Sequence, residues 1–216
     1  MNASVPRQPI TLLVFSASLR ARSLNTRLAE LAAVTIEANG GEVDRSSMRD
    51  FDCPSYDQDL QDEGFPAGAE EFRRRLERCD GFVISSPEYN ASMPGLLKNA
   101  IDWVSRYSPQ PFNEKYGLLL SASPSMVGGN RGVWALRVPF EHLGARIYPD
   151  MFSLAQAHSA FSEEGRIADQ QLQERFDTNI VNFMNSVEAF KHYPCVKRAW
   201  VEYLGERPEP VIDRVQ

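Results

Sequence analysis

The sequence predicts an α/β fold in which a doubly wound five-stranded parallel sheet carries helices on both faces. Two observations predict it. Apolar runs of strand length alternate with segments of helical periodicity, and the runs at 10–15 and 81–85 are nearly continuous, as in strands buried on both sides. The run at 43–48 is polar and belongs at a sheet edge. An edge position for the second strand favours the strand order 2-1-3-4-5.

Each strand is expected where a short apolar run follows a turn-forming segment, and each helix where apolar residues recur every three or four positions. The expected strands span residues 10–15, 43–48, 81–85, 116–121 and 145–152. The expected helices span residues 24–38, 67–78, 96–104, 133–143 and 169–190. This alternation requires right-handed crossovers between parallel strands.

Composition limits the classes of protein to which the chain can belong. With 216 residues, 43% of them hydrophobic and 24% charged, it has an ordinary globular composition and can bury a core without disulfides or a metal. The 23 Lys and Arg residues stand against 29 Asp and Glu, a net charge of -6. This balance argues against a protein that coats nucleic acid or anionic lipid, so neither partner is expected.

Cysteine and histidine spacing argues against a metal site and for a reducing compartment. The three cysteines, which form no CxxC pair, are Cys53, Cys79 and Cys195. The three histidines, which also stand far apart in the sequence, are His142, His158 and His192. Only Arg7 precedes the apolar run at 10–15, which is too short to span a membrane and is interpreted as a strand rather than a signal peptide. We therefore expect a cytoplasmic protein.

In such a sheet, ligands bind beyond the carboxyl ends of the strands, so the loops after the first, third and fourth strands are the candidates. The first loop, residues 16–26, contains four hydroxyl groups, the Asn25 amide, and the guanidiniums of Arg20 and Arg22. These donors and the positive end of the following helix suit a phosphate. A simple helix cap, with Ser23 or Asn25 satisfying the first turn, is the alternative that the pattern leaves open.

The second loop, residues 85–95, is bracketed by Pro87 and Pro94 and opens a helix. Within it, Tyr89 could cover a flat heteroaromatic ring and Asn90 could donate to a carbonyl or ring nitrogen. A proline-shaped turn at the start of the helix accounts for the same residues without a ligand.

The third loop, residues 121–131, contains the pair Gly128-Gly129, which permits close approach of the backbone to a ligand. A flexible loop is the alternative. The sequence has no GxGxxG fingerprint, no GxxxxGK[ST] loop and no GxSxG elbow, which argues against a nucleoside triphosphatase and an α/β-hydrolase.

Two stretches of the chain resemble signatures of the NADPH-dependent FMN reductase family. Residues 18–25, SLRARSLN, closely resemble its GSxRxxSxN signature, and residues 87–103, PEYNASMPGLLKNAIDW, resemble PEYNxSxPGxLKNAIDW almost residue for residue. Ser123 with Gly128-Gly129 is similar to the family's third flavin loop. The resemblance extends over roughly residues 10–190, and it implies a flavodoxin-like fold that holds FMN non-covalently.

The resemblance implies cofactor-binding roles at the matched positions. The residues that would hold the FMN phosphate are Ser18, Arg20, Ser23 and Asn25, with Leu24 in the same set. The residues that would surround the isoalloxazine ring are Pro87, Glu88, Tyr89 and Asn90 along one edge, with Ser123 and Gly128 on the other side. Ala17 stands where the family has glycine, and alanine has access to fewer backbone angles.

The implied activity is an oxidoreductase that takes hydride from NADPH or NADH onto FMN and passes electrons to a small acceptor by a ping-pong mechanism. The acceptor could be a quinone, an azo or nitro compound, an oxyanion, free flavin or oxygen. No catalytic side chain is required, and a role for Glu88 in the turn is favoured over a catalytic one. Arg22 and Arg131 are candidates for the 2′-phosphate of NADPH, with surface solvation as the alternative.

Two other classes stay open: a flavodoxin-type electron carrier that docks a protein partner, and a flavin-free binding module with the same fold. The resemblance implies a homodimer or homotetramer. We expect residues 1–191 to form the FMN-binding domain and 192–216 a C-terminal extension, whose aromatic side chains would lie in a subunit contact.

Overall fold

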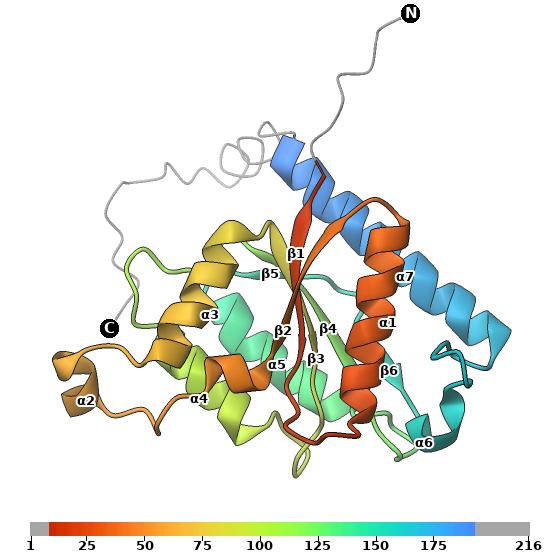
Figure 1. Ribbon diagram of the computed structural model, residues 1–216, viewed down its shortest axis with the longest axis horizontal. Coiled ribbons are helices and arrows are strands. Elements are labelled where there is room, and N and C mark those ends of the chain that lie inside the picture. Colours follow the sequence, from red (N-terminus) through yellow and green to blue (C-terminus); the bar gives the residue numbers. More distant parts are fainter. Residues whose placement is uncertain (1–8, 193–216) are drawn as a thin grey trace, which may run out of the picture.

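A six-stranded parallel sheet forms the middle layer of residues 9–192, the part of the chain that the computed structural model describes (Figure 1). The strand order is β2-β1-β3-β4-β5, and β6 also pairs with β4. The strands are β1 (Thr11–Ser16), β2 (Glu42–Ser47), β3 (Gly81–Ser85), β4 (Tyr116–Ala122), β5 (Arg146–Ile147) and β6 (Phe152–Leu154). All pairings are parallel, so the predicted sheet and its order are confirmed.

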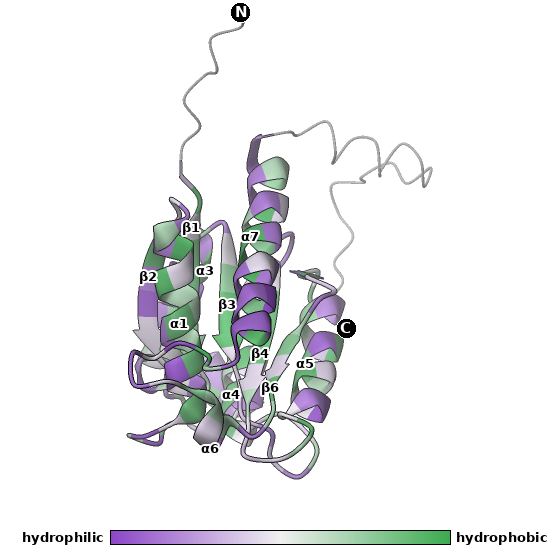
Figure 2. Ribbon diagram, turned by 90° about the vertical axis from the view of Figure 1, so that its right-hand side faces the viewer, coloured by the Kyte–Doolittle hydropathy of each residue, from purple (hydrophilic) through white to green (hydrophobic). Residues whose placement is uncertain are grey.

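Helices cover both faces of the sheet, as predicted. One face carries α1 (Leu24–Ala38) and α7 (Gln170–His192), and the other carries α3 (Ala67–Arg78), α4 (Gly95–Val104) and α5 (Asn130–His142). The shorter elements are the 3-10 helix η1 (Met48–Phe51), α2 (Gln58–Glu63) and α6 (Ala157–Ala160). In Figure 2 the central strands are mainly hydrophobic, whereas β2 and the helices also carry hydrophilic segments.

The continuous apolar run of β1 follows from this sandwich. Successive side chains of a strand point to opposite faces. Leu12 and Val14 therefore contribute to the core under α1 and α7, whereas Leu13 and Phe15 contribute to the core under α3 to α5. All four side chains are buried, and each such burial stabilises the fold by about 1.5–3 kcal/mol.

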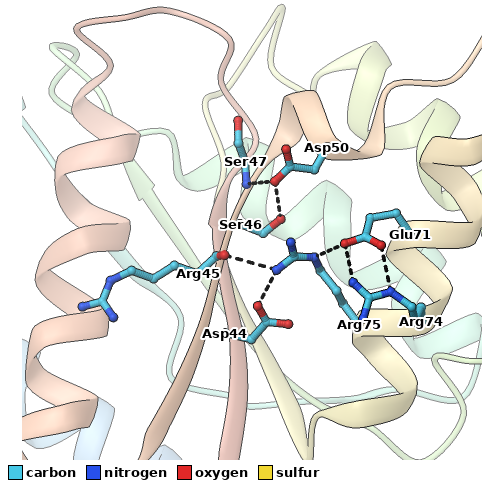
Figure 3. Close-up of polar contacts among 8 residues, drawn as sticks. All are labelled: Asp44, Arg45, Ser46, Ser47, Asp50, Glu71, Arg74 and Arg75. Carbon is cyan, nitrogen blue, oxygen red and sulfur yellow. Dashed lines mark hydrogen bonds and ion pairs between the residues drawn. The ribbon is translucent and has the colours of Figure 1, made fainter.

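The edge strand β2 is polar because ion pairs fasten it to helices on both faces. On one face Arg75 of α3 pairs with Asp44, donates to the carbonyl oxygen of Arg45 at 3.2 Å and pairs with Glu71 (Figure 3). On the other face the Arg45 side chain pairs with Glu30 and Glu37, both of α1.

The predicted fifth strand over residues 145–152 is wrong as one continuous element. The Tyr148 N–H still donates to the Gly117 carbonyl oxygen at 2.8 Å, but the chain then bends at Pro149 and leaves the ladder. Pairing with β4 resumes only where Phe152 lies opposite Leu120. The strand is therefore divided into β5 and β6.

The first and last described elements meet at the end of the molecule away from the carboxyl ends of the strands (Figure 1). Near the end of α7, Lys191 Nζ bonds to Asp80 Oδ2 at 2.8 Å and to the Pro9 carbonyl oxygen at 3.1 Å. The predicted C-terminal extension lies outside the described residues apart from its first residue, His192, which ends α7. None of the helices described between residues 9 and 192 has the length and apolar character needed to cross a bilayer.

Candidate functional site

The structure brings the three loops of interest together at one edge of the sheet. The loops after β1, β3 and β4 all emerge at the lower edge in Figure 1. The Ala17 N–H donates to the Ser85 carbonyl oxygen at 2.9 Å and so joins the first loop to the second. Because β1, β3 and β4 are adjacent and parallel, the convergence is a direct result of the strand order.

The hydroxyl of Ser23 caps α1, as the capping interpretation predicted. Ser23 Oγ accepts hydrogen bonds from the N–H groups of Asn25 at 3.2 Å and Thr26 at 3.4 Å. The hydroxyl oxygen of Ser18 accepts more weakly from the Arg20 N–H at 3.4 Å. These bonds shape the loop and fix the start of the helix.

Two guanidiniums of this loop have no partner in the part of the chain that the structure describes. Arg20 and Arg22 are exposed, and neither side chain forms an ion pair or hydrogen bond with residues 9–192. The first turn of α1 has no acidic residue. The loop is fastened from outside by Arg49, which donates to the Leu19 carbonyl oxygen at 2.9 Å and was not singled out from the sequence. The result is a cationic helix start without a counter-ion from the described chain.

Asn25 lies deeper than the resemblance implies. Its side chain is buried, with the residue 4% exposed, and is directed at the neighbouring strands. Its Nδ2 donates to the Ala122 carbonyl oxygen at 2.9 Å, and its Oδ1 accepts from the Ala122 N–H at 2.9 Å and the Ser85 hydroxyl at 3.0 Å. Asn25 thus holds the start of α1 against β3 and β4.

The second loop forms a tight hairpin at the edge of the sheet where the three loops meet, which we call the rim. The Tyr89 N–H donates to the Ser92 carbonyl oxygen at 2.9 Å, and the Ser92 N–H returns a bond of 3.0 Å. Between them Asn90 and Ala91 have φ of 51° and 63°, the left-handed pair of a type I′ turn. Tyr89 is 45% exposed, so its ring is available at the rim.

The second half of the signature stretch 87–103 has a structural role that the sequence did not reveal. Asn99 Oδ1 accepts from the Tyr56 N–H at 2.8 Å, and its Nδ2 donates to the Pro54 carbonyl oxygen at 2.8 Å. Trp103 Nε1 donates to the same carbonyl oxygen at 2.8 Å. These residues of α4 hold the loop that follows η1.

Glu88 and Arg131 bind each other. Arg131 Nε and Nη2 lie 2.9 and 2.6 Å from Glu88 Oε1, and the Gly132 N–H donates to Oε2 at 3.2 Å. The Glu88 carboxylate therefore faces α5, and Pro87 precedes it in the turn. Arg131, a candidate for the NADPH 2′-phosphate, is engaged in this pair, whereas Arg22 has no partner among residues 9–192.

The third loop contains a turn that requires glycine at two successive positions. Gly128 and Gly129 have φ of 63° and 84°, and a Cβ at Gly128 would lie 2.9 Å from the Ala155 nitrogen. Only glycine fits there without strain. Ser123 Oγ accepts from the Ser125 N–H at 3.2 Å, which closes the start of the loop.

Ala17, which departs from the family signature, causes no strain. The non-glycine residues with positive φ between residues 9 and 192 are Asn90, Ala91, Glu114 and Gln156. Ala17 is fully buried and keeps its hydrogen bond to β3. The first loop therefore tolerates the methyl group.

The described cysteines are poorly suited to nucleophilic chemistry. Burial raises the pKa of the Cys53 and Cys79 thiols to about 11, so both stay protonated near neutral pH. No group of three or more His, Cys, Asp or Glu side chains among the described residues could hold a metal ion.

Comparison with known proteins gives the family. The model of the NADPH-dependent FMN reductase family matches residues 10–159. The chain is 33% identical over 166 residues to an NAD(P)H-dependent FMN reductase of Pseudomonas aeruginosa, covering 76% of this chain and 88% of that protein. It is 34% identical over 191 residues to a quinone reductase of Escherichia coli, covering 85% and 97%.

Solved structures agree. The flavoenzyme NAD(P)H:(acceptor) oxidoreductase FerB of Paracoccus denitrificans superposes with a TM-score of 0.73 at 27% identity, over 83% of this chain and 97% of that one. A flavodoxin from the Archaea, at 10% identity and a TM-score of 0.51, shares the fold. The predicted flavodoxin-like fold and flavin-oxidoreductase class are confirmed: the chain belongs to the NADPH-dependent FMN reductase family.

Proposed function

We propose that the chain binds FMN at the rim formed by the three loops, takes hydride from NAD(P)H and reduces a small acceptor of the quinone type. The observation that carries the proposal is the pair of guanidiniums at the start of α1 that have no partner within residues 9–192, beside two further loops suited to a flat ring. Family membership supports the same chemistry.

The residues of the first loop fit a phosphate. Arg20 would pair with the dianion, and Ser18, Ser23 and the N–H of Leu24 would add donors at the positive end of α1. Asn25 would act indirectly, because its amide fixes the start of the helix to β4. Two buried hydroxyls at this edge of the sheet, those of Ser16 and Ser121, have no partner within residues 9–192, which suits a rim that receives a polar ligand.

The other two loops fit an aromatic ring. Tyr89 and the N–H groups of Asn90 and Ala91, which the hairpin bonds do not use, would meet one edge of the isoalloxazine, with Ser123 and Gly128 on the other side. N–H groups aimed at the ring would stabilise negative charge on it. When bound, FMN supplies the hydride-accepting and electron-donating chemistry, and the protein supplies position and exclusion of water.

The rim favours an uncharged, planar acceptor. Each loop presents an exposed apolar side chain: Leu19 is 43% exposed, Tyr89 45% and Met126 75%. Covering an aromatic substrate removes more apolar surface of these side chains from water than contact with an oxyanion does, and so contributes more binding free energy. Relatives from Escherichia coli and Pseudomonas putida are named quinone reductase, which supports this choice of acceptor.

For the hydride donor, Arg22 is the residue we assign to the 2′-phosphate of NADPH. It is exposed and unpartnered within the described chain, whereas Arg131 is bound to Glu88. Arg22→Ala should raise the KM for NADPH and leave the KM for NADH unchanged.

The deciding experiment is anaerobic reduction of the FMN-loaded protein, followed in the visible absorption of the flavin. Rapid bleaching by NADPH or NADH, and recovery on adding a benzoquinone, is the expected result. Bleaching only in the presence of a separate reductase would identify an electron carrier instead. A protein that takes up no FMN would contradict the proposal.

We further propose a cytoplasmic homodimer or homotetramer in which residues 1–191 form the FMN-binding domain and 192–216 an extension in a subunit contact. The free thiols of Cys53 and Cys79 support a reducing compartment. Light scattering of the full chain and of a chain truncated after Lys191 tests the assembly. An unchanged molar mass per particle, corrected for the missing residues, would remove the extension from the contact.

A further inference from the structure

The carboxylate of Glu88 links two of the three loops. It belongs to the second loop, directly before the hairpin, yet its hydrogen-bond partners lie in α5. Arg131 Nε and Nη2 approach Oε1 at 2.9 and 2.6 Å, and the Gly132 N–H approaches Oε2 at 3.2 Å. Both oxygens are therefore used by the helix that begins at the end of the third loop.

The burial of the two partners is unequal. The Glu88 side chain is 8% exposed, whereas that of Arg131 is 62% exposed. A carboxylate this deep is stable only when it is paired and hydrogen-bonded. Its place in the structure is thus fixed by α5, and the part of Arg131 that does not contact it faces solvent.

The helix depends on Glu88 in return. α5 has Gly129 at its N-cap and forms no side-chain cap of its own. The Glu88 carboxylate adds a cap from a different loop: it accepts from the Gly132 N–H, which also donates to the Gly129 carbonyl oxygen at 3.1 Å, and it places negative charge at the positive helix end. Gly132 allows this approach, since a Cβ there would lie 3.1 Å from Glu88 Cα.

The hairpin next to Glu88 needs external support. Asn90 and Ala91 both hold left-handed backbone angles, and Ala91 is a residue that disfavours them. Such a conformation persists where the surrounding structure fixes it. The contacts that Glu88 makes to α5 lie immediately before this turn in the chain.

We propose that Glu88 is a positioning residue, which fixes the hairpin of the second loop relative to the Gly128-Gly129 turn and so sets the affinity and environment of the flavin ring. This inference rests on the proposed function. Glu88 need not touch the flavin; it acts by holding the two loops in one arrangement through Arg131 and Gly132.

The test compares Glu88→Gln, Arg131→Gln and the double variant with the unmodified protein. Glu88→Gln keeps an oxygen for the Gly132 N–H but loses the charge that holds Arg131. Arg131→Gln removes the same ion pair, but a glutamine amide can still donate to the Glu88 carboxylate and the Gly132 N–H still binds Oε2, so this variant should fold. The matched control is Arg137→Gln, which removes the ion pair of Arg137 with Glu141 farther along α5.

The measurements are the FMN dissociation constant from fluorescence quenching, the visible spectrum and midpoint potential of the bound flavin, and the melting temperature of the flavin-free protein. Each single variant should weaken FMN binding about five- to tenfold and shift the visible spectrum. The FMN affinity of the double variant should be no lower than that of the single variant that binds FMN less tightly, because the two residues act as a unit. The control should bind as the unmodified protein does.

Several results would overturn the inference. Unchanged FMN affinity, spectrum and potential in Arg131→Gln would do so, and this variant decides alone if Glu88→Gln does not fold. A lower melting temperature with unaltered flavin properties would make Glu88 a helix cap only. Losses that multiply in the double variant would show two independent effects. If the unmodified protein itself binds no FMN, the proposed function fails, which is a different outcome from each of these.

Discussion

The side-chain amide of Asn25 pairs with the backbone of Ala122 as a neighbouring strand would. Its Nδ2 donates to the carbonyl oxygen and its Oδ1 accepts from the N–H, both at 2.9 Å. At Ala122, the last residue of β4, β6 is the neighbouring strand on one side, whereas pairing with β3 ends at Leu120. The Asn25 amide takes the place of a strand there and anchors α1 at the rim. The first and third loops are thereby held in register.

Replacing Asn25 with alanine should therefore destabilise the whole domain. The change leaves both backbone groups of Ala122 and the Ser85 hydroxyl without their buried partner. We expect the free energy of unfolding to fall by about 3 kcal/mol, measured by urea denaturation of the flavin-free protein. The control is Asn182→Ala on the exposed side of α7, which should change stability by about 0.5 kcal/mol or less. Equal stability of the two variants would contradict this account.

Arg20→Ala should weaken FMN binding without affecting the fold. The side chain is exposed and has no partner among residues 9–192, so its removal leaves no buried group unsatisfied. We expect a loss of about 1.5–3 kcal/mol in the free energy of FMN binding, the usual range for a hydrogen bond to a charged group. Arg78→Ala, an exposed arginine at the opposite end of the sheet, should bind FMN normally. An FMN affinity unaltered by the first substitution would remove Arg20 from the phosphate site.

Gly128→Ala should be much more harmful than Gly40→Ala. Both glycines have left-handed backbones, with φ of 63° and 83°, so alanine is strained at each by about 1–2 kcal/mol. A Cβ at Gly40 would meet nothing within 4 Å, whereas at Gly128 it would lie 2.9 Å from backbone atoms of Leu154 and Ala155. We expect Gly128→Ala to lose about 3 kcal/mol of unfolding free energy by thermal or urea denaturation. Similar losses at the two positions would show that crowding in the third loop is unimportant.

Acid should weaken the contact between β2 and α3 through Glu71. Hydrogen bonds from Arg74, and then Arg75, lower the pKa of Glu71 from 4.5 to about 2 (Figure 3). A lowered pKa in the folded state means that the stabilisation is present above the pKa of the unfolded chain and is lost as the pH falls toward 2. At pH 7 the unmodified protein should exceed Glu71→Gln in unfolding free energy by about 1 kcal/mol, and the gap should shrink at pH 3.

The measurement is urea unfolding at the two pH values. Glu63→Gln, at an exposed site at the end of α2, is the control and should differ from the unmodified protein by the same amount at both. A gap for Glu71→Gln that does not narrow in acid would contradict the assignment of the ion pair.

The sequence by itself determined the first four strands, the strand order and the loops that form the rim. The nearly continuous apolar composition of runs such as 81–85 predicts burial on both faces, and the polar character of 43–48 places that strand at the edge. Once the order is known, the loops after β1, β3 and β4 must meet, so the candidate residues could be collected without coordinates. The two signature stretches identified the family for the same reason: they are local.

Only the tertiary structure decided how individual side chains in those loops are used. Asn25 contacts a residue 97 positions away, and Glu88 contacts one 43 positions away, so no local pattern separates a ligand-facing side chain from one that holds the scaffold. The break in the predicted fifth strand also depends on context, because the chain advances five residues from Ile147 to Phe152 while β4 advances three from Gly117 to Leu120, so the pairing cannot be continuous. Hydrogen bonds between distant segments depend on geometry that a linear pattern does not contain, and this is why the fold could be predicted while the roles of Asn25, Glu88 and Arg131 could not.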